Sequence, residues 1–225
     1  VVDAAALYFG TWQPPAAGNK APDPRRAPAV PAGQSRILTV PTEIPQAYVE
    51  VAWPTDDFWD IRRTRRFLVL SHIVSDRMRR IIREEDGQSY SQYAFHEPSQ
   101  AYPGYGVFHA AAEIKPGAED AVIARIRAIA ADLVKNGVTP EELDRAREPI
   151  MTGIRELVKT NDYWLRSVLS GCRSHPERLD WSRNFMNDYQ SVTTDEITGL
   201  ARQYLDDSRC VRVIIRPEGT AQINP

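Results

Sequence analysis

Two hydrogen-bond donors lie seven residues apart where a long helical pattern gives way to a strand-like one. Arg83 precedes an acidic run and Gly87, and Tyr90 follows the glycine. A guanidinium donates a rigid fork of N–H groups to a carbonyl or carboxylate, and a phenol donates to a carbonyl or an oxyanion. The pair could therefore hold a peptide. From the residues alone, a simpler interpretation is favoured, in which Arg83 pairs with an acid and Tyr90 is a half-buried strand aromatic.

Histidine spacing argues against a metal site in this chain. The sequence has only four histidines, and no two are four residues apart, so no helical pair can grip one zinc ion. His72 and Asp76 are one helical turn apart, which fits a surface pair better than a ligand set. His109 and Glu113 are both expected on a strand, as ordinary sheet residues. We therefore expect no metal ligand among these residues.

Nucleophile and phosphate motifs are also absent. No G-x-S-x-G segment and no glycine-rich phosphate loop occurs. Cys172 lies near His175, but no third residue is evident that would orient the pair for thiol chemistry. With Cys210, the chain has two cysteines, which form neither a disulfide scaffold nor a metal spacing, so they leave the redox compartment open.

The composition is that of a globular protein with balanced charge. Hydrophobic residues make up 42% of 225 residues, and the net charge is -2, with 28 basic and 30 acidic residues. This balance disfavours a nucleic-acid-binding domain. Arginine clusters at 62–66 and 77–83 fit a solvated helix face with some ion pairs. No run approaches the ~18 apolar residues of a membrane span, and the opening residues lack a signal-peptide pattern.

The chain divides into a short opening part and one large domain. Residues 1–34 are interpreted as the end of a preceding helix followed by a connector with six prolines between Thr11 and Gln34. Residues 35–225 are interpreted as one α+β domain. Proline cannot donate to a regular hydrogen-bond ladder, which is why the connector is expected to be irregular.

Periodicity predicts the elements of the large domain. Period-two alternation predicts strands near 36–40, 47–53, 88–96, 104–113 and 211–215. Apolar residues at three- and four-residue steps predict a long helix over about 58–83, another over 118–136, and further helices from 139 toward 170, near 176–190 and over 194–205. Because strands come in neighbouring pairs, we expect helices on one face of a mostly antiparallel sheet.

Several segments together resemble the pitrilysin/insulinase family of zinc metallopeptidases, the inverzincins. The segment from Arg83 to Ser91 is similar to the family's R-E-x-x-G-x-(S/A)-Y-S stretch, and Ser75-Asp76-Arg77-Met78 resembles the helical turn before it. The order and spacing of the pieces extend the likeness over nearly the whole chain. The other similar segments are Tyr8-Phe9-Gly10, 137–143, 159–165, 193–205 and 211–217.

The resemblance implies a fold, a partner and roles for two residues. Family members are built from ferredoxin-like α+β units of the kind found in LuxS and mitochondrial processing peptidase, and two halves enclose peptides. The N-terminal half holds zinc through an H-x-x-E-H helix, and the C-terminal half contributes an Arg and a Tyr seven residues apart. By resemblance, Tyr90 would donate to the scissile carbonyl or its oxyanion, and Arg83 would hold the substrate backbone.

The departures from the family pattern limit what this chain does alone. It has no H-x-x-E-H motif, so we expect zinc in a separate N-terminal half, on the same or another chain, and no hydrolysis by this chain alone. Asp86 stands where the family commonly has Leu. The alternative is a non-catalytic scaffold or assembly subunit with the same fold. The similar bacterial members also suggest a periplasmic or envelope location.

Overall fold

The computed structural model describes residues 2–10, 28–87 and 89–219. In this part of the chain the strands form one 5-stranded sheet in the order β1-β5-β2-β4-β3. β1 runs parallel to β5, and the remaining neighbours are antiparallel. The strands are β1 (Ser35–Val40), β2 (Ala47–Thr55), β3 (Ser89–Pro98), β4 (Gly106–Ile114) and β5 (Val211–Pro217).

The helices have the start signals that the sequence contains. Asp60 caps α2 by accepting from the backbone N–H of Arg63, and Thr139 and Thr193 each form a reciprocal capping box with a glutamate three residues later. The helices are α1 (Val2–Phe9), α2 (Ile61–Met78), α3 (Glu119–Asn136), α4 (Pro140–Leu157), α5 (Glu177–Arg183), α6 (Phe185–Gln190) and α7 (Thr194–Tyr204).

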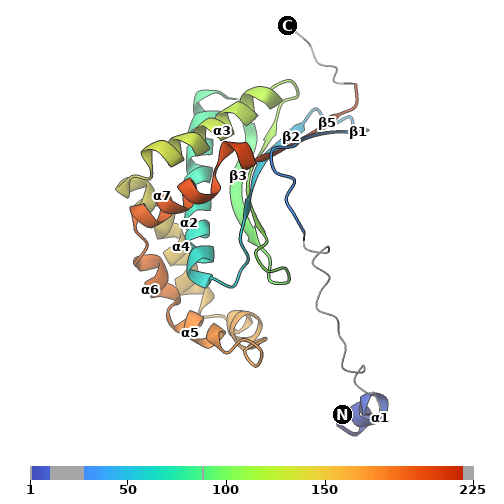
Figure 1. The fold of residues 1–225 in the computed structure, drawn as a ribbon, viewed down its shortest axis with the longest axis vertical. Coiled ribbons are helices and arrows are strands. Elements are labelled where there is room, and N and C mark those ends of the chain that lie inside the picture. Colours follow the sequence, from blue (N-terminus) through green and yellow to red (C-terminus); the bar gives the residue numbers. More distant parts are fainter. Residues whose placement is uncertain (1, 11–27, 88, 220–225) are drawn as a thin grey trace.

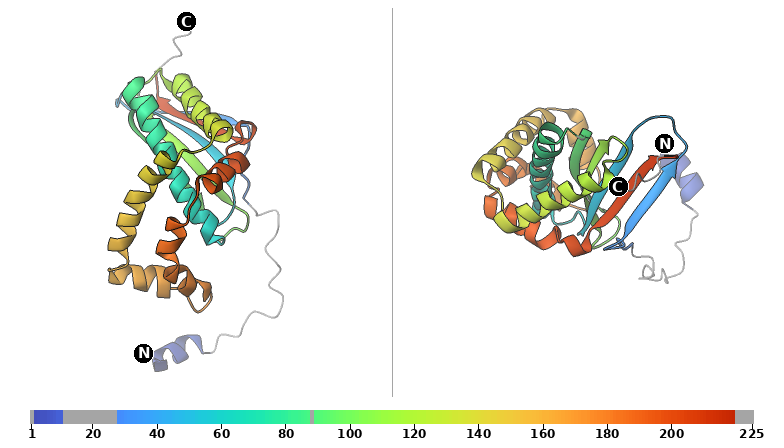
Figure 2. Two further views of the ribbon diagram at one scale, coloured as in Figure 1. Left: turned by 90° about the vertical axis from the view of Figure 1, so that its left-hand side faces the viewer. Right: turned by 90° about the horizontal axis from the view of Figure 1, so that it is seen from above.

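The domain has two layers, with helices α2 to α7 gathered on one face of the sheet (Figures 1 and 2). The core lies between the layers, where alternate residues of β2 and β4 meet the apolar sides of α2 and α3. Trp53, Phe67 and Phe108 are among its largest fully buried side chains. Burial of such side chains stabilises the fold by about 1.5–3 kcal/mol each.

The fold class expected from the sequence is confirmed, with small shifts at the ends of elements. β2 continues through Pro54 to Thr55, two residues past its predicted end, where Pro54 pairs with Val107. The predicted single helix from 139 ends at Leu157 and is followed by a π-helical turn over Tyr163–Leu169. Pro149 lies inside α4. The proline-rich connector falls largely in residues 11–27, outside the described residues. None of the described helices is long and apolar enough to cross a membrane.

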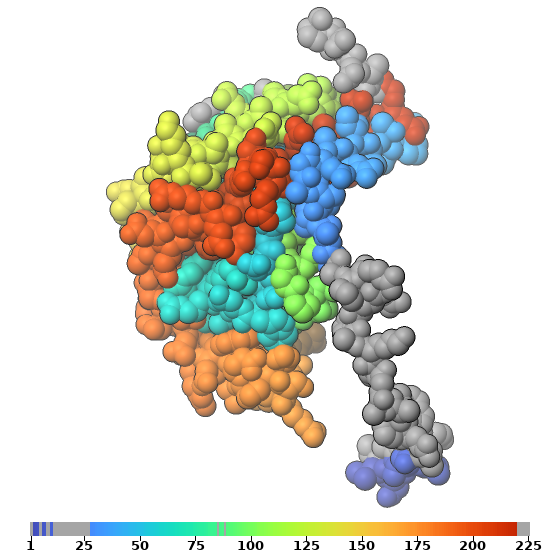
Figure 3. All heavy atoms as spheres, viewed as in Figure 1, coloured from blue at the N-terminus to red at the C-terminus, as the bar shows by residue number. Residues whose placement is uncertain are grey.

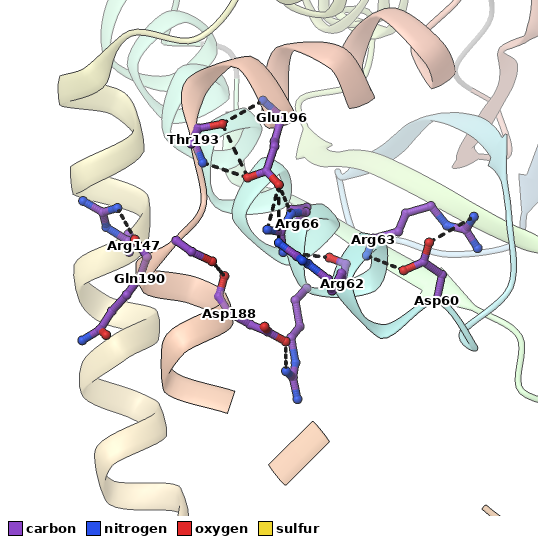
Figure 4. A network of polar contacts seen from close by, with 11 residues as sticks. Asp60, Arg62, Arg63, Arg66, Arg147, Asp188, Gln190, Thr193 and Glu196 are labelled. Carbon is purple, nitrogen blue, oxygen red and sulfur yellow. Dashed lines mark hydrogen bonds and ion pairs between the residues drawn. The ribbon is translucent and has the colours of Figure 1, made fainter. Parts of the chain in front are cut away.

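The expectation that the α2 arginines form a solvated face is wrong for three of them. Arg65, Arg66 and Arg77 are buried, each against a carboxylate from a distant helix. Figure 4 shows Arg66 directed at Glu196, whose carboxylate also closes the cap of α7. A buried guanidinium requires such a partner, because an unpaired buried charge is strongly destabilising. These ion pairs therefore fix α4, α6 and α7 against α2.

Candidate functional site

A helix-to-strand junction positions both site residues that the sequence predicts. α2 ends at Met78 and continues as the π-helical turn Arg79–Glu85, and the backbone N–H of Asp86 donates to the carbonyl of Ile81. Gly87 then reverses the chain with a φ of 63°, a conformation that L side chains rarely adopt. Single π-helical turns occur frequently at functional sites. Arg83 lies exposed on this turn.

Tyr90 lies at an irregular position of β3. Ser89 pairs with Ile114 and Ser91 pairs with Glu113, so Tyr90 is the extra residue of a β-bulge between them. A bulge bends its strand and re-aims a side chain, and bulges are enriched beside active sites. The Tyr90 side chain is 48% exposed. Two consecutive irregularities, the π-helical turn and the bulge, therefore present Arg83 and Tyr90 to solvent at one end of the α2–β3 pair.

Neighbouring acids at the junction already have partners. Glu84 accepts from Arg79 at 2.8 Å, and Asp86 accepts from Arg125 Nε at 2.9 Å. Among the residues whose side chains the structure describes, no ion pair or hydrogen bond involves the Arg83 guanidinium. The ion-paired Arg83 of the simpler interpretation is thus not present in the described part of the chain. A guanidinium in this setting has its N–H fork available to an added carbonyl or carboxylate.

The other residue pairs considered from the sequence lie where structural roles explain them. Asp76 accepts from Arg79 and Arg145, and these bonds outweigh burial to hold the pKa of its carboxyl below the usual value. His72 is exposed on α2. His109 lies on the sheet face opposite the helices, with its Nδ1 2.6 Å from Glu50 Oε1. Asp76 and the Nδ1 of His109 thus have partners within the fold, whereas the buried Nε2 of His109 has no hydrogen-bond partner among the described residues and lies 3.7 Å from Glu97 Oε2.

Among the described residues, the geometry supports neither a thiol nucleophile nor a metal site. Cys172 and Cys210 are free, and His175 bonds to Glu177 at 3.0 Å while stacking on Trp59. Within residues 2–10, 28–87 and 89–219, no group of three or more His, Cys, Asp or Glu is placed to hold a metal ion. The donor set of the described residues therefore does not fit a zinc ion.

A large cavity, not expected from the sequence, lies between α2, β3 and the helical segment 157–189. We call it the aromatic cavity, and its volume is about 660 Å³. In Figure 3 the orange segment that closes it lies against the cyan start of α2. The one sequence signal for it is the concentration of aromatic residues in 58–59 and 163–189. Its walls include Phe58, Leu68, Phe95, Trp181, Phe185 and Tyr189.

Solved structures of proteases have the same fold. A peptidase M16 inactive domain from Pseudomonas fluorescens matches with a TM-score of 0.71 and 19% identity over 85% of this chain and 45% of that one. The periplasmic protease PqqL from Escherichia coli matches at 0.68 and 13%, over 83% of this chain and 21% of that one. A protease from Helicobacter pylori matches at 0.69 and 14%, over 96% and 52%. The chain thus spans about half of these proteins or less.

The family assignment comes from the sequence itself. No curated protein matches this chain. The family model for the peptidase M16 inactive domain matches residues 1–150 of the 225. The match includes the junction with Arg83 and Tyr90, and it confirms the metallopeptidase resemblance seen in the motifs. The chain belongs to the peptidase M16 inactive-domain family.

Proposed function

We propose that this chain is the substrate-contacting, zinc-free part of a zinc-dependent endopeptidase. The observation that supports this most is the exposure of Arg83 and Tyr90 together on a π-helical turn and a β-bulge. A scaffold surface needs neither an available guanidinium fork nor a bulged strand that turns a phenol outward. The zinc site lies in a separate N-terminal half, on the same chain or another, and that half supplies the metal chemistry.

Each residue has one role in this proposal. Tyr90 donates its O–H to the scissile carbonyl as negative charge develops on the oxygen, and a neutral phenol does so without adding a competing base. Arg83 donates its N–H fork to the peptide backbone and holds the peptide in register. By similarity to the periplasmic protease PqqL, the parent protein works in the periplasm or cell envelope.

The test uses the chain together with its zinc-bearing half. Tyr90→Phe removes only the phenol oxygen, so kcat should fall by about 10²–10³-fold, the usual loss for one oxyanion donor. Bound zinc, measured by metal analysis, should stay unchanged. Tyr93→Phe on the same strand is the matched control and should retain turnover. Wild-type kcat in the Tyr90→Phe enzyme would refute the role.

A scaffold subunit remains the second candidate, because the described residues include no group of three or more His, Cys, Asp or Glu that could hold a metal ion. It predicts that purification from the native source yields this chain without a zinc-bearing partner and without peptide hydrolysis. Recovery of a stoichiometric zinc-bearing half, with activity that depends on Tyr90, distinguishes the enzyme from the scaffold.

A further inference from the structure

The aromatic cavity combines apolar walls with basic side chains. In the part of the chain that the structure describes, no aspartate or glutamate lines it, whereas Arg65, His72, His96 and Arg178 do. Arg65 is neutralised there, because it pairs with Asp188 and also donates to the carbonyl of Trp181. The cavity is therefore complementary to a ligand that combines an apolar group with a negative charge.

Arg178 is the cation available to such a ligand. Within the described residues, its Nη1 and Nη2 reach only neutral acceptors at long range, the Ser170 carbonyl at 3.5 Å and Gln100 Oε1 at 3.3 Å. Its buried Nε has no hydrogen-bond partner among the described residues. The adjacent Glu177 bonds to His175 instead. The Arg178 guanidinium lies 5.9 Å from the Trp59 ring centroid, which helps to hold the fork in place.

The wall formed by β3 favours insertion of a side chain over addition of a strand. β3 is an edge strand, but the backbone N–H of Ala94 already donates to Ser75 Oγ at 2.8 Å. An added strand would have to displace this bond at the middle of the edge. Ser75 and Ala94 both line the cavity beside the strand. A side chain that enters this cavity does not need the N–H of Ala94, so the bond to Ser75 stays in place.

A second, smaller hollow lies next to the aromatic cavity, on the side of Arg79, the first residue of the π-helical turn. Its volume is about 260 Å³, it shares His72 and Ser75 with the aromatic cavity, and it reaches Gln92 on β3. Tyr90 lies two residues before Gln92. At ~3.3 Å per residue, the step from Tyr90 to Phe95 is about 17 Å along the strand. An extended peptide of five or six residues spans that distance.

We propose that the aromatic cavity binds the C-terminal residue of a peptide, with an apolar side chain inside and the α-carboxylate on Arg178. That the ligand is a peptide rests on the proposed function. Guanidinium and carboxylate make paired, charge-assisted hydrogen bonds, which gives selectivity for a free C-terminus over an internal residue. The domain thereby selects peptides that end in an aromatic or large aliphatic residue.

The experiment compares two forms of one peptide on the 225-residue chain. Tryptophan fluorescence is titrated with acetyl-Gly-Ser-Gly-Ala-Leu-Phe as the free acid and as the C-terminal amide. The acid should bind about tenfold tighter, the scale of one charge-assisted contact. In the Arg178→Gln variant, the affinity for the acid peptide should fall to the affinity for the amide. Arg173→Gln, an exposed arginine outside the cavity wall, is the matched control and should keep the difference.

Two further measurements identify the class of ligand and the place where it binds. Ser167 is an exposed residue of the cavity wall, so Ser167→Trp should fill the cavity and weaken both peptide forms while circular dichroism remains that of the wild type. Decanoate supplies a carboxylate and an apolar chain without a peptide, and it should bind more weakly than the acid peptide. Equal binding of acid and amide by the wild type, or no binding of either, would overturn the proposal. Tighter binding of decanoate would overturn the peptide assignment.

These outcomes are separable from those of the proposed function. The peptide titration uses this chain without the zinc-bearing half, and its comparisons of acid with amide and of wild type with Arg178→Gln leave Arg83 and Tyr90 unchanged. A chain that prefers the acid peptide, in an enzyme whose Tyr90→Phe variant keeps full turnover, retains the cavity site and loses the catalytic role. If the chain shows no preference for the acid peptide while Tyr90→Phe lowers turnover, the cavity site is refuted and the catalytic role is retained.

Discussion

Arg77 donates to both carboxylate oxygens of Glu142, from Nε at 2.8 Å and from Nη2 at 2.9 Å. Both side chains are buried, and the pair joins α2 to the first turn of α4. Arg77 Nη2 also donates to the carbonyl of Gly137 at 3.0 Å. Because Glu142 closes the capping box with Thr139 as well, one carboxylate both neutralises a buried cation and begins a helix.

Removing the arginine should strongly destabilise the domain. Arg77→Met leaves the Glu142 charge without its partner, and breaking a buried pair in this way typically costs about 3–5 kcal/mol. Urea unfolding followed by circular dichroism measures the loss. The double variant R77M/E142L should lose less than R77M alone, since it removes the stranded charge, although it also removes part of the α4 cap.

An exposed pair provides the control for this measurement. Arg183 bonds to Asp180 at 2.7 Å on the surface of α5. Arg183→Met should therefore change the free energy of unfolding by no more than about 1 kcal/mol. Similar losses for Arg77→Met and Arg183→Met would show that burial of the Arg77 pair contributes nothing.

His96 should make the fold sensitive to mild acid. Burial first, and then the electrostatic interactions with Arg63 and with His109, together lower the pKa of its imidazole to about 3. The unfolded histidine takes up a proton below about 6.5, whereas the folded one does not until about pH 3. Stability is thus complete above pH 6.5 and is lost as the pH falls toward 3, by up to ~1.4 kcal/mol per pH unit.

The contribution of His96 is isolated by a difference between variants. Urea unfolding at pH 7.5 and at pH 5.5 should show a smaller acid loss in His96→Gln than in the wild type. His175→Gln, at a partly exposed histidine, is the control and should behave as the wild type. An equal pH dependence in His96→Gln and the wild type would contradict the buried neutral imidazole.

Substitution of Arg83 or Tyr90 should hardly change the free energy of unfolding of the domain. Both side chains are exposed, and surface substitutions of this kind usually change the free energy of unfolding by about 0.5 kcal/mol or less. Arg83→Gln and Tyr90→Phe are expected within that range in urea unfolding. Phe67→Ala, at a fully buried core position, is the positive control, with an expected loss of about 3–5 kcal/mol. Large losses in the first two variants would make the site residues structural.

The elements of this fold were predictable because the periodicity of their residues is local. Strand alternation in β2 and the three- and four-residue steps of α2 each follow from one segment and one buried face. The burial of Arg66 was not predictable in this way. Its partner Glu196 lies 130 residues away, and only the packing of α7 on α2 brings the two together.

The candidate site was predictable in part for the same reason. Arg83 and Tyr90 are close in sequence, so a motif could identify them. The π-helical turn and the bulge that expose them leave no local signal beyond Gly87. The aromatic cavity was missed, because its walls come from segments as distant as Phe58 and Tyr189. Tertiary packing therefore decides the features that pattern analysis did not predict.

Substitution by alanine should have opposite effects on stability at two glycines, one inside α4 and one just before it. Gly153 lies inside α4 with nothing near an added Cβ, so Gly153→Ala should stabilise the domain by about 0.5–1 kcal/mol by restricting the unfolded chain. Gly137 has a φ of 78°, and an added Cβ would lie 2.9 Å from Thr198 Oγ1. Gly137→Ala should destabilise by more than about 1 kcal/mol. Thermal unfolding monitored by circular dichroism should raise Tm in the first variant and lower it in the second, and shifts of the same sign would contradict this assignment of backbone strain.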